Sequence, residues 1–266
     1  MKIKVLFENK NLLVLDKPAG YVVHGDGSAK KQKSIADYIL KNYKKIKGVG
    51  ENVFIESEGK AGKKTIEIQK PGIVHRLDRD TTGCLIIAKT QDSFINLKNQ
   101  FQTRKIKKEY TALVWGHIKN DTGIINAPIA RSRQDFRKKE VVSIRRGEKS
   151  TELLFRGEER DALTRYKVLE RLAVFGEKVT LVSFYPDTGR MHQIRIHSKS
   201  IGHPIVGDDL YGIKNTKTEK FSTKLFGKTT PHQLLHARAI TLFNPNSGET
   251  IKVEAPLPKE FKKAIK

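Results

Sequence analysis

The sequence HRLDRDTTGCLIIA, residues 75–88, joins a polar loop directly to a short apolar run. Cys84–Ala88 is apolar throughout, which is typical of a buried β-strand. The preceding loop, His75–Gly83, ends in glycine and carries Asp78 between Arg76 and Arg79. Polar loops held by rigid strands often carry functional residues. Flanking positive charges favour the ionised carboxylate that a nucleophile or base requires. From these residues alone, a purely structural Arg–Asp pair is an equal alternative.

A second cluster lies around Tyr110, which opens an expected strand behind Lys107 and Lys108. A tyrosine beside cations can stack on a nucleobase while the cations hold phosphate. An aromatic residue of the core or of a strand edge is the alternative. The same sequence therefore fits either nucleotide binding or ordinary packing.

The third cluster, Asp187–His197, is rich in hydrogen-bond donors and leads into a helix expected over Met191–Ser200, with Gly202 as its stop signal. Arg195 lies off the apolar face of this helix and could pair with a carboxylate in a cleft. A salt bridge at the surface is the alternative.

The overall charge favours a polyanionic partner, above all nucleic acid. The chain of 266 residues has a formal net charge of +23 and a pI near 10.0. Arg131–Lys149 holds eight Lys or Arg against three acidic residues and suits a basic hairpin along a phosphate backbone. A solvated basic surface is the alternative in both cases. One cysteine and the lack of an apolar leader or membrane-length segment predict a cytoplasmic protein.

Metal and cofactor chemistries find little support. His192 and His197 stand five positions apart, which does not fit the i, i+4 pair of a helical zinc site. Asp187, Asp208 and Asp209 would bind a metal only by weak analogy. The glycines form no dinucleotide-binding or P-loop motif. We therefore predict no cofactor and no metal.

Strands are expected to outnumber helices. The pattern predicts strands at Ile3–Phe7, Leu12–Leu15, Tyr110–Gly116, Val168–Glu170 and Val179–Tyr185. It predicts a loop over Asp16–Gly20, a helix over Ile35–Lys45 with Ser34 as N-cap, a surface loop or small excursion over Lys47–Lys70, a helix capped by Asp92, and a basic tail or short helix over Lys259–Lys266.

These segments together resemble the RluA-like family of pseudouridine synthases. Further matching blocks occur in the expected order over about residues 5–245, at Asp16–Gly20, Lys108–Tyr110, Gly189–His197, Gly202–Gly212 and Leu234–Ala237. Thr82 stands where the family usually has Ser, and Met191 where Thr is commoner; neither change removes a catalytic group. Many relatives carry an N-terminal S4-like domain, and we expect this sequence to start directly with the catalytic region, either naturally or because that domain was cut away.

The resemblance implies an α+β fold, with a long, mixed, mostly antiparallel sheet, flanking helices and a central catalytic cleft. It implies one catalytic domain over residues 1–266. Asp78 matches the catalytic Asp, Tyr110 the tyrosine that packs on the target base, and Arg195 the arginine that pairs with the catalytic carboxylate. Arg76 matches a residue that fills the space left by the flipped nucleotide, and Lys17 is a further candidate for RNA contact.

The implied activity is isomerisation of specific uridines to pseudouridine in structured RNA. The stretch Val22–Gly27 and the block spacing favour 23S ribosomal RNA, with transfer RNA as the competing substrate. A catalytically silent RNA-binding or ribosome-assembly factor is the alternative class. We expect a monomer that binds neither DNA nor membranes. The target uridine and the chemical role of Asp78 stay open.

Overall fold

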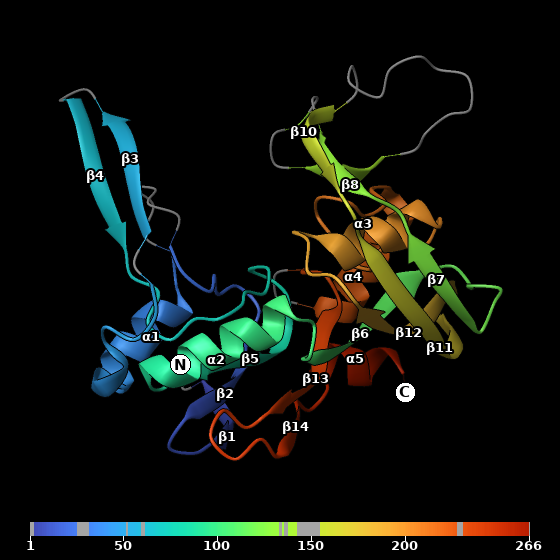
Figure 1. The fold of residues 1–266 in the computed structure, drawn as a ribbon. Helices are drawn as coiled ribbons and strands as arrows, with labels where there is room; N and C mark the ends of the chain where they lie inside the picture. Colours follow the sequence, from blue (N-terminus) through green and yellow to red (C-terminus); the bar gives the residue numbers. More distant parts are fainter. Residues whose placement is uncertain are drawn as a thin grey trace. The chain divides into compact units, whose positions relative to one another are not determined.

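The computed structural model describes residues 3–25, 32–51, 53–59, 62–132, 135, 138–142, 155–227 and 231–265. The chain divides into two compact units. The first contains Met1–Lys107 and Ala237–Pro256, and the second contains Lys108–His236 and Leu257–Lys266. Figure 1 gives the element labels used below. Within the described ranges, no helix has the length and apolar character needed to cross a membrane.

The first unit is built on a sheet in the order β1-β2-β5-β13, with β14 paired to β13. The pairs β1–β2, β2–β5 and β13–β14 are antiparallel. The strands are β1 (Lys4–Glu8), β2 (Leu12–Lys17), β5 (Thr82–Ala88), β13 (Leu235–Phe243) and β14 (Thr250–Glu254). Every residue of β5 is buried, as its apolar sequence predicts.

The strand β2 runs two residues further than predicted. Asp16 and Lys17, expected to open a loop, pair with Cys84 and Gly83 of β5. The local sequence is polar, but β2 lies between β1 and β5, so the ladder continues to Lys17. Gly83 has a φ of +104°, and a Cβ atom there would lie 2.3 Å from the carbonyl oxygen of Ala237. Only glycine therefore fits where the loop enters β5.

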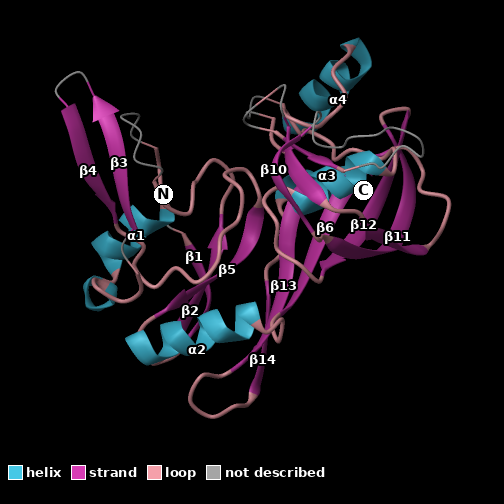
Figure 2. Ribbon diagram, turned by 45° about the horizontal axis from the view of Figure 1, so that its top comes forward, coloured by secondary structure: helices cyan, strands magenta, loops and turns pink. Residues whose placement is uncertain are grey.

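One face of the first sheet is covered by α2 (Gln91–Gln102), as Figure 2 shows. Phe94 and Leu97 of this helix pack into a core with residues of β2, β5 and β13. The N-cap is Thr90, whose hydroxyl accepts from the amide of Ser93 at 3.2 Å. The prediction that Asp92 caps the helix was wrong, because Asp92 lies in its first turn. An acidic residue there still favours the helix dipole.

The helix α1 (Ile35–Asn42) has Ser34 as its N-cap, as predicted, but ends before the predicted Lys45; the Ser34 hydroxyl accepts from the amide of Asp37 at 3.0 Å. A short 3₁₀-helix, η1 (Lys44–Ile46), follows. The segment after it, expected to be a surface loop or a small excursion, contains a hairpin, with β3 (Val53–Gly59) paired to β4 (Gly62–Ile68). The few apolar residues of these strands are followed or preceded by Gly, Lys, Glu, Ser and Thr, so the sequence shows no clear strand pattern.

The second unit is built on four antiparallel strands in the order β6-β12-β11-β7. They are β6 (Lys107–Trp115), β7 (Thr122–Asn126), β11 (Leu163–Val174) and β12 (Glu177–Pro186). A smaller sheet contains β8 (Ile129–Ser132), β9 (Lys139–Val141) and β10 (Phe155–Arg160). The predicted basic hairpin is confirmed where β8 pairs with β9; residues 133, 134, 136, 137 and 143–154 lie outside the described chain.

Helices cover both faces of the four-stranded sheet. On one face, α3 (Gln193–Ser200) packs its Ile194 against Val114 and Val182. On the other, α4 (Thr216–Phe226) and α5 (Lys259–Ala264) pack against Leu113 and Trp115. The alternation of β6 side chains between faces produces this division.

The predicted fold class is confirmed, since the described chain consists mostly of antiparallel sheet with few helices. The helix expected over Met191–Ser200 begins at Gln193 and ends just before Gly202, whose φ is +82°. The C-terminal segment forms the short helix α5. The central cleft and the single catalytic domain stay predictions.

Candidate active site

The loop that carries Asp78 is held from both of its sides. The amide of Ile86 donates to Nε2 of His75 at 2.8 Å, and the His75 ring stacks on Phe101 with centroids 4.7 Å apart. Leu77 is buried. Asp78 itself is half-buried, and its carbonyl oxygen accepts from the amide of Thr81 at 3.2 Å. The loop is therefore a fixed turn that leads into β5.

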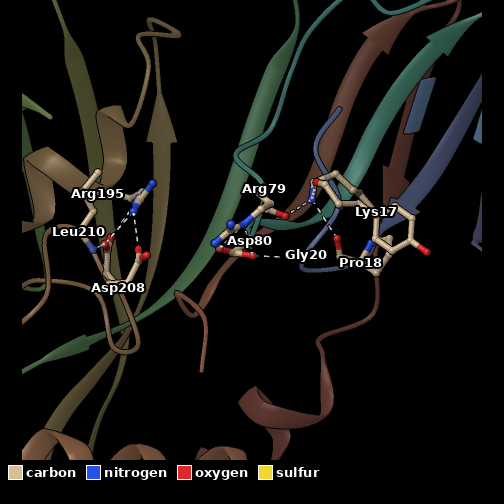
Figure 3. Close-up of polar contacts among 10 residues, drawn as sticks. Lys17, Pro18, Gly20, Arg79, Asp80, Arg195, Asp208 and Leu210 are labelled. Carbon is tan, nitrogen blue, oxygen red and sulfur yellow. Dashed lines mark hydrogen bonds and ion pairs between the residues drawn. The ribbon is translucent and has the colours of Figure 1, made fainter. Parts of the chain in front are cut away.

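A second turn, which follows β2, is attached to the same loop. The ammonium group of Lys17 donates to the carbonyl oxygens of Arg79 and Tyr21, both at 2.7 Å, and of Pro18 at 3.0 Å (Figure 3). The Asp80 carboxylate pairs with Arg79 at 2.8 Å and accepts from the amide of Gly20 at 3.2 Å. Two segments more than fifty residues apart in sequence thus form one structure around Asp78.

Lys17 is fully buried, so the predicted contact with RNA does not fit its position. Its three carbonyl partners match the three N–H groups of an ammonium ion. Burial lowers the pKa of Lys17 to about 7, while the nearby carboxylates of Asp80 and Asp78 act to raise it. The side chain holds the loop that carries Asp78 and does not face solvent.

We expect Lys17→Met to lower the free energy of unfolding by about 1–3 kcal/mol, because it leaves three partly buried carbonyl groups without this donor. The loosened loop should also lower kcat more than it raises KM. Urea unfolding and steady-state kinetics would measure both effects. Lys10→Met, at an exposed position of the same unit, is the matched control and should change neither quantity appreciably.

The pH dependence of this variant separates the role of Lys17 from general destabilisation. The pKa of Lys17 is about 7 in the folded protein and 10.5 for the free side chain. Between these values the unfolded chain binds more protons, so this group makes the free energy of unfolding rise with pH. Lys17→Met should lose that rise. An equal pH dependence in both proteins would contradict the buried position of the amine.

In the second unit, Tyr110 lies half-buried on β6, opposite Phe184 of β12. The neighbouring Lys108 donates to the carbonyl oxygen of Thr188 at 3.3 Å. This contact ties the start of β6 to the turn before α3. Tyr110 thus combines partial packing in the core with an accessible side, which a residue that stacks on a base requires.

Gln193 organises the turn that leads into α3. Its carbonyl oxygen accepts from the hydroxyl of Thr188 at 2.7 Å and from the amide of Arg190 at 2.9 Å. Its amide group donates to the carbonyl oxygen of Leu163 at 3.0 Å and to the hydroxyl of Thr164 at 2.9 Å. Every polar atom of this buried side chain is therefore engaged in holding the turn against β11.

His197, also in this cluster, has a structural position. Its Nδ1 lies 2.9 Å from the hydroxyl of Thr164, and its Nε2 lies 3.0 Å from the carbonyl oxygen of Ala127. Burial lowers the pKa of His197, although the hydrogen bond to Ala127 acts in the opposite direction. The ring fixes α3 against the neighbouring strands.

Arg195 forms a buried, bidentate ion pair with Asp208 (Figure 3). Its Nε lies 2.7 Å from Oδ2, and a terminal nitrogen lies 2.8 Å from Oδ1. The Asp208 carboxylate also accepts from the amides of Leu210 and Tyr211. Burial alone would raise the pKa of Asp208, but the hydrogen bonds and charge of Arg195 and the two amides lower it overall. This pair fixes the guanidinium of Arg195 in place.

The Tyr211 side chain completes the surroundings of this ion pair. The Arg195 guanidinium lies 5.1 Å from the Tyr211 ring centroid. The Tyr211 hydroxyl accepts from the amide of Lys139 on β9 at 3.0 Å and lies 3.0 Å from Nδ1 of His192. His192 has a φ of +59°, an uncommon backbone conformation for a residue with a side chain. Tyr211 thereby joins the β8–β9 hairpin to the arginine.

The structure therefore gives each predicted site residue a position. Arg195 pairs with Asp208, and its pairing with Asp78 stays a prediction. The roles of Tyr110 and of the exposed Arg76 stay predictions as well. The sequence patterns did not identify Gln193 as an anchor, and they gave Asp208 only as a weak metal candidate and as a member of the matching block Gly202–Gly212. The signal available for Asp208 was an acidic residue just after the apolar pair Ile205-Val206.

The net charge of +23 fits a protein that acts on a polyanion such as nucleic acid. Residues 11–200 match the family model described as RNA pseudouridylate synthase. The chain belongs to this family. It is an RNA pseudouridine synthase, an isomerase that converts uridine to pseudouridine.

Relatives align along nearly the whole chain. An RNA pseudouridine synthase of Synechocystis, described as uncharacterised, is 34% identical over 99% of this chain and 68% of its own length. The ribosomal large subunit pseudouridine synthase D of Nitrosomonas europaea is 34% identical over 97% of this chain and 63% of its own length. Among solved structures, human RNA pseudouridylate synthase domain containing 4 has a TM-score of 0.64 at 25% identity, covering 98% of this chain and 91% of its own.

Proposed function

We propose that this enzyme isomerises one or more uridines of large-subunit ribosomal RNA, with Asp78 as its catalytic carboxylate. The observation that carries the proposal is the fixed loop around Asp78, in which Lys17, His75 and Leu77 hold the carboxylate at the end of a buried strand. Relatives from Nitrosomonas, Pseudomonas and Zymomonas named as ribosomal large subunit pseudouridine synthases support the choice of RNA. A cytoplasmic location follows from this substrate.

The proposed reaction explains the inventory of residues. The N1–C1′ bond of uridine breaks, the base rotates, and a C5–C1′ bond forms. A proton leaves C5 and one is gained at N1, so electrons and atoms balance within the substrate. Acid–base and electrostatic catalysis by protein side chains are sufficient for these steps. Asp78 attacks the base or the sugar, or removes a sugar proton.

The other candidate site residues have roles at the displaced nucleotide and at the Asp78 carboxylate. Taking a uridine out of the helical stack costs a few kcal/mol, which phosphate contacts and filling of the vacated space offset. We assign that filling to Arg76 and stacking on the target base to Tyr110. We assign to Arg195 the role of cationic partner that orients the Asp78 carboxylate during the reaction.

The choice of RNA is tested by supplying two unmodified substrates. Large-subunit ribosomal RNA and a mixture of transfer RNAs, both transcribed in vitro, are incubated with the enzyme and mapped for pseudouridine. We expect new pseudouridines at one or a few positions of the ribosomal transcript. Modification confined to transfer RNA would contradict the proposed substrate and leave the role of Asp78 standing.

A further inference from the structure

Three lysines form a stripe along α4. Lys217, Lys220 and Lys224 follow the i, i+3, i+7 spacing that brings side chains to one side of a helix, and all three are exposed. The buried residues Phe221 and Leu225 attach the helix to the core from another side. The spacing of the three lysines therefore places them along one side of a helix that is packed against the core.

The helix α5 adds three more exposed lysines, Lys259, Lys262 and Lys263. The ammonium group of Lys263 donates to the carbonyl oxygens of Lys224 and Leu225, at 2.6 and 3.2 Å, and so fixes α5 at the C-terminal end of α4. We call these six residues the α4–α5 lysine surface. Its members are Lys217, Lys220, Lys224, Lys259, Lys262 and Lys263.

Little negative charge offsets this surface. On α5 the Glu260 side chain is largely buried, with its carboxylate 4.0 Å from the ammonium of Lys259. On α4 the exposed Glu219 stands at i+2 from Lys217, away from the lysine stripe. A concentration of ammonium groups remains, which a polyanion would stabilise.

This surface lies on the opposite side of the sheet from Tyr110. On β6, Tyr110, Ala112 and Val114 pack into the core shared with α3, whereas Leu113 and Trp115 pack into the core shared with α4 and α5. The α4–α5 lysine surface thus belongs to a different face of the second unit from the residues assigned to the target base.

We propose that the α4–α5 lysine surface binds the phosphate backbone of an RNA segment outside the target site. The proposal rests on the proposed function only in taking a large, folded RNA as the substrate. Lysine ammonium groups on flexible stems bind phosphate as point charges and carry little information about base sequence. The surface therefore adds affinity for a long RNA without choosing the uridine.

The chemistry of the surface favours RNA over an anionic membrane. Phe175, in the turn between β11 and β12, is an exposed aromatic residue beside this surface. Its ring packs edge-on against Phe221, with centroids 5.5 Å apart, and the Lys224 ammonium lies 5.8 Å from the Phe175 ring centroid. The ring is therefore occupied by contacts within the protein. A helix that inserts into a lipid interface needs a broad exposed apolar face, which α4 buries in the core.

The test removes the stripe and measures binding instead of catalysis. The variant Lys217→Gln/Lys220→Gln/Lys224→Gln keeps good helix formers on α4. The control is Lys41→Gln/Lys44→Gln/Lys45→Gln, which removes the same charge from exposed positions around the end of α1. Binding of both to a large-subunit ribosomal RNA transcript is followed from 50 to 200 mM salt, with circular dichroism to verify folding.

We expect the α4 variant to bind about tenfold more weakly at low salt and to show a salt slope smaller by about two, because three phosphate contacts are lost. The control should lose less than threefold. An unchanged slope, an equal loss in the control, or tighter binding to anionic vesicles than to RNA would overturn the proposal. Since the readout is binding, failure to find pseudouridine in that transcript would affect only the proposed function.

Discussion

Asp78→Asn is expected to lower the rate of pseudouridine formation by more than about 1,000-fold, which corresponds to about 4 kcal/mol of transition-state stabilisation. The amide has nearly the shape of the carboxylate but is neither a nucleophile nor a base at neutral pH. The affinity for RNA should change by less than about threefold, since lysines and arginines provide most of the binding. Single-turnover rates and filter binding on the same transcript would measure the two effects.

The neighbouring carboxylate provides a control for this variant. Asp80 lies in the same loop and is also half-buried, but it binds Arg79 and the amide of Gly20. Asp80→Asn should slow the reaction by less than about tenfold, because the amide oxygen can still accept from Gly20. Equal losses at the two positions would mean that loop structure, and not the Asp78 carboxylate, limits the reaction.

Asp208→Ala is expected to lower the free energy of unfolding by about 3–5 kcal/mol, because it removes the buried carboxylate that pairs with Arg195, while Asp209, 3.6 Å from Arg195, is exposed. The pKa of Asp208 in the folded protein is lower than its ordinary value of 3.8. The stabilisation that the Asp208 carboxylate gives the folded protein is therefore fully present above pH 3.8 and is lost as the pH falls through the folded pKa. The difference between the two proteins should therefore shrink in acid. Urea unfolding at several pH values would show this.

An exposed ion pair serves as the comparison for Asp208. Asp121 pairs with Arg171 at 2.6 Å, but its side chain is 81% exposed. Asp121→Ala should cost less than about 1 kcal/mol, since water replaces the lost partner. If Asp208→Ala proved no more destabilising than Asp121→Ala, the buried pair would not be the anchor of Arg195.

Local signals predicted the elements that local contacts determine. The Ser34 cap and the glycine stop at Gly202 were confirmed, because caps depend on residues within one turn. The cap of α2 was wrong because Thr90 and Asp92 both suit an N-cap, and sequence alone does not separate two such residues. The extension of β2 to Lys17 was missed because a neighbouring strand, distant in sequence, supplies its pairing.

The roles of the candidate site residues stay predictions from chemistry and resemblance, whereas the contacts that hold these residues were not predicted. Lys17 binds the carbonyl of Arg79, 62 positions away, and Gln193 binds Thr164, 29 positions away. No local pattern identifies such partners, because they arise only when the sheets form. The sequence predicted which residue carries the carboxylate, and the structure shows what holds its loop.

The most direct test of the central claim uses a ribosomal transcript with tritium at C5 of every uridine. Isomerisation must release the C5 hydrogen to solvent, so the unmodified enzyme is predicted to release tritium up to a fixed number of equivalents per transcript, and the Asp78→Asn protein to release none on the same timescale. Equal release by both proteins would contradict the role of Asp78. No release by the unmodified enzyme, with RNA binding demonstrated, would contradict its proposed action on this RNA.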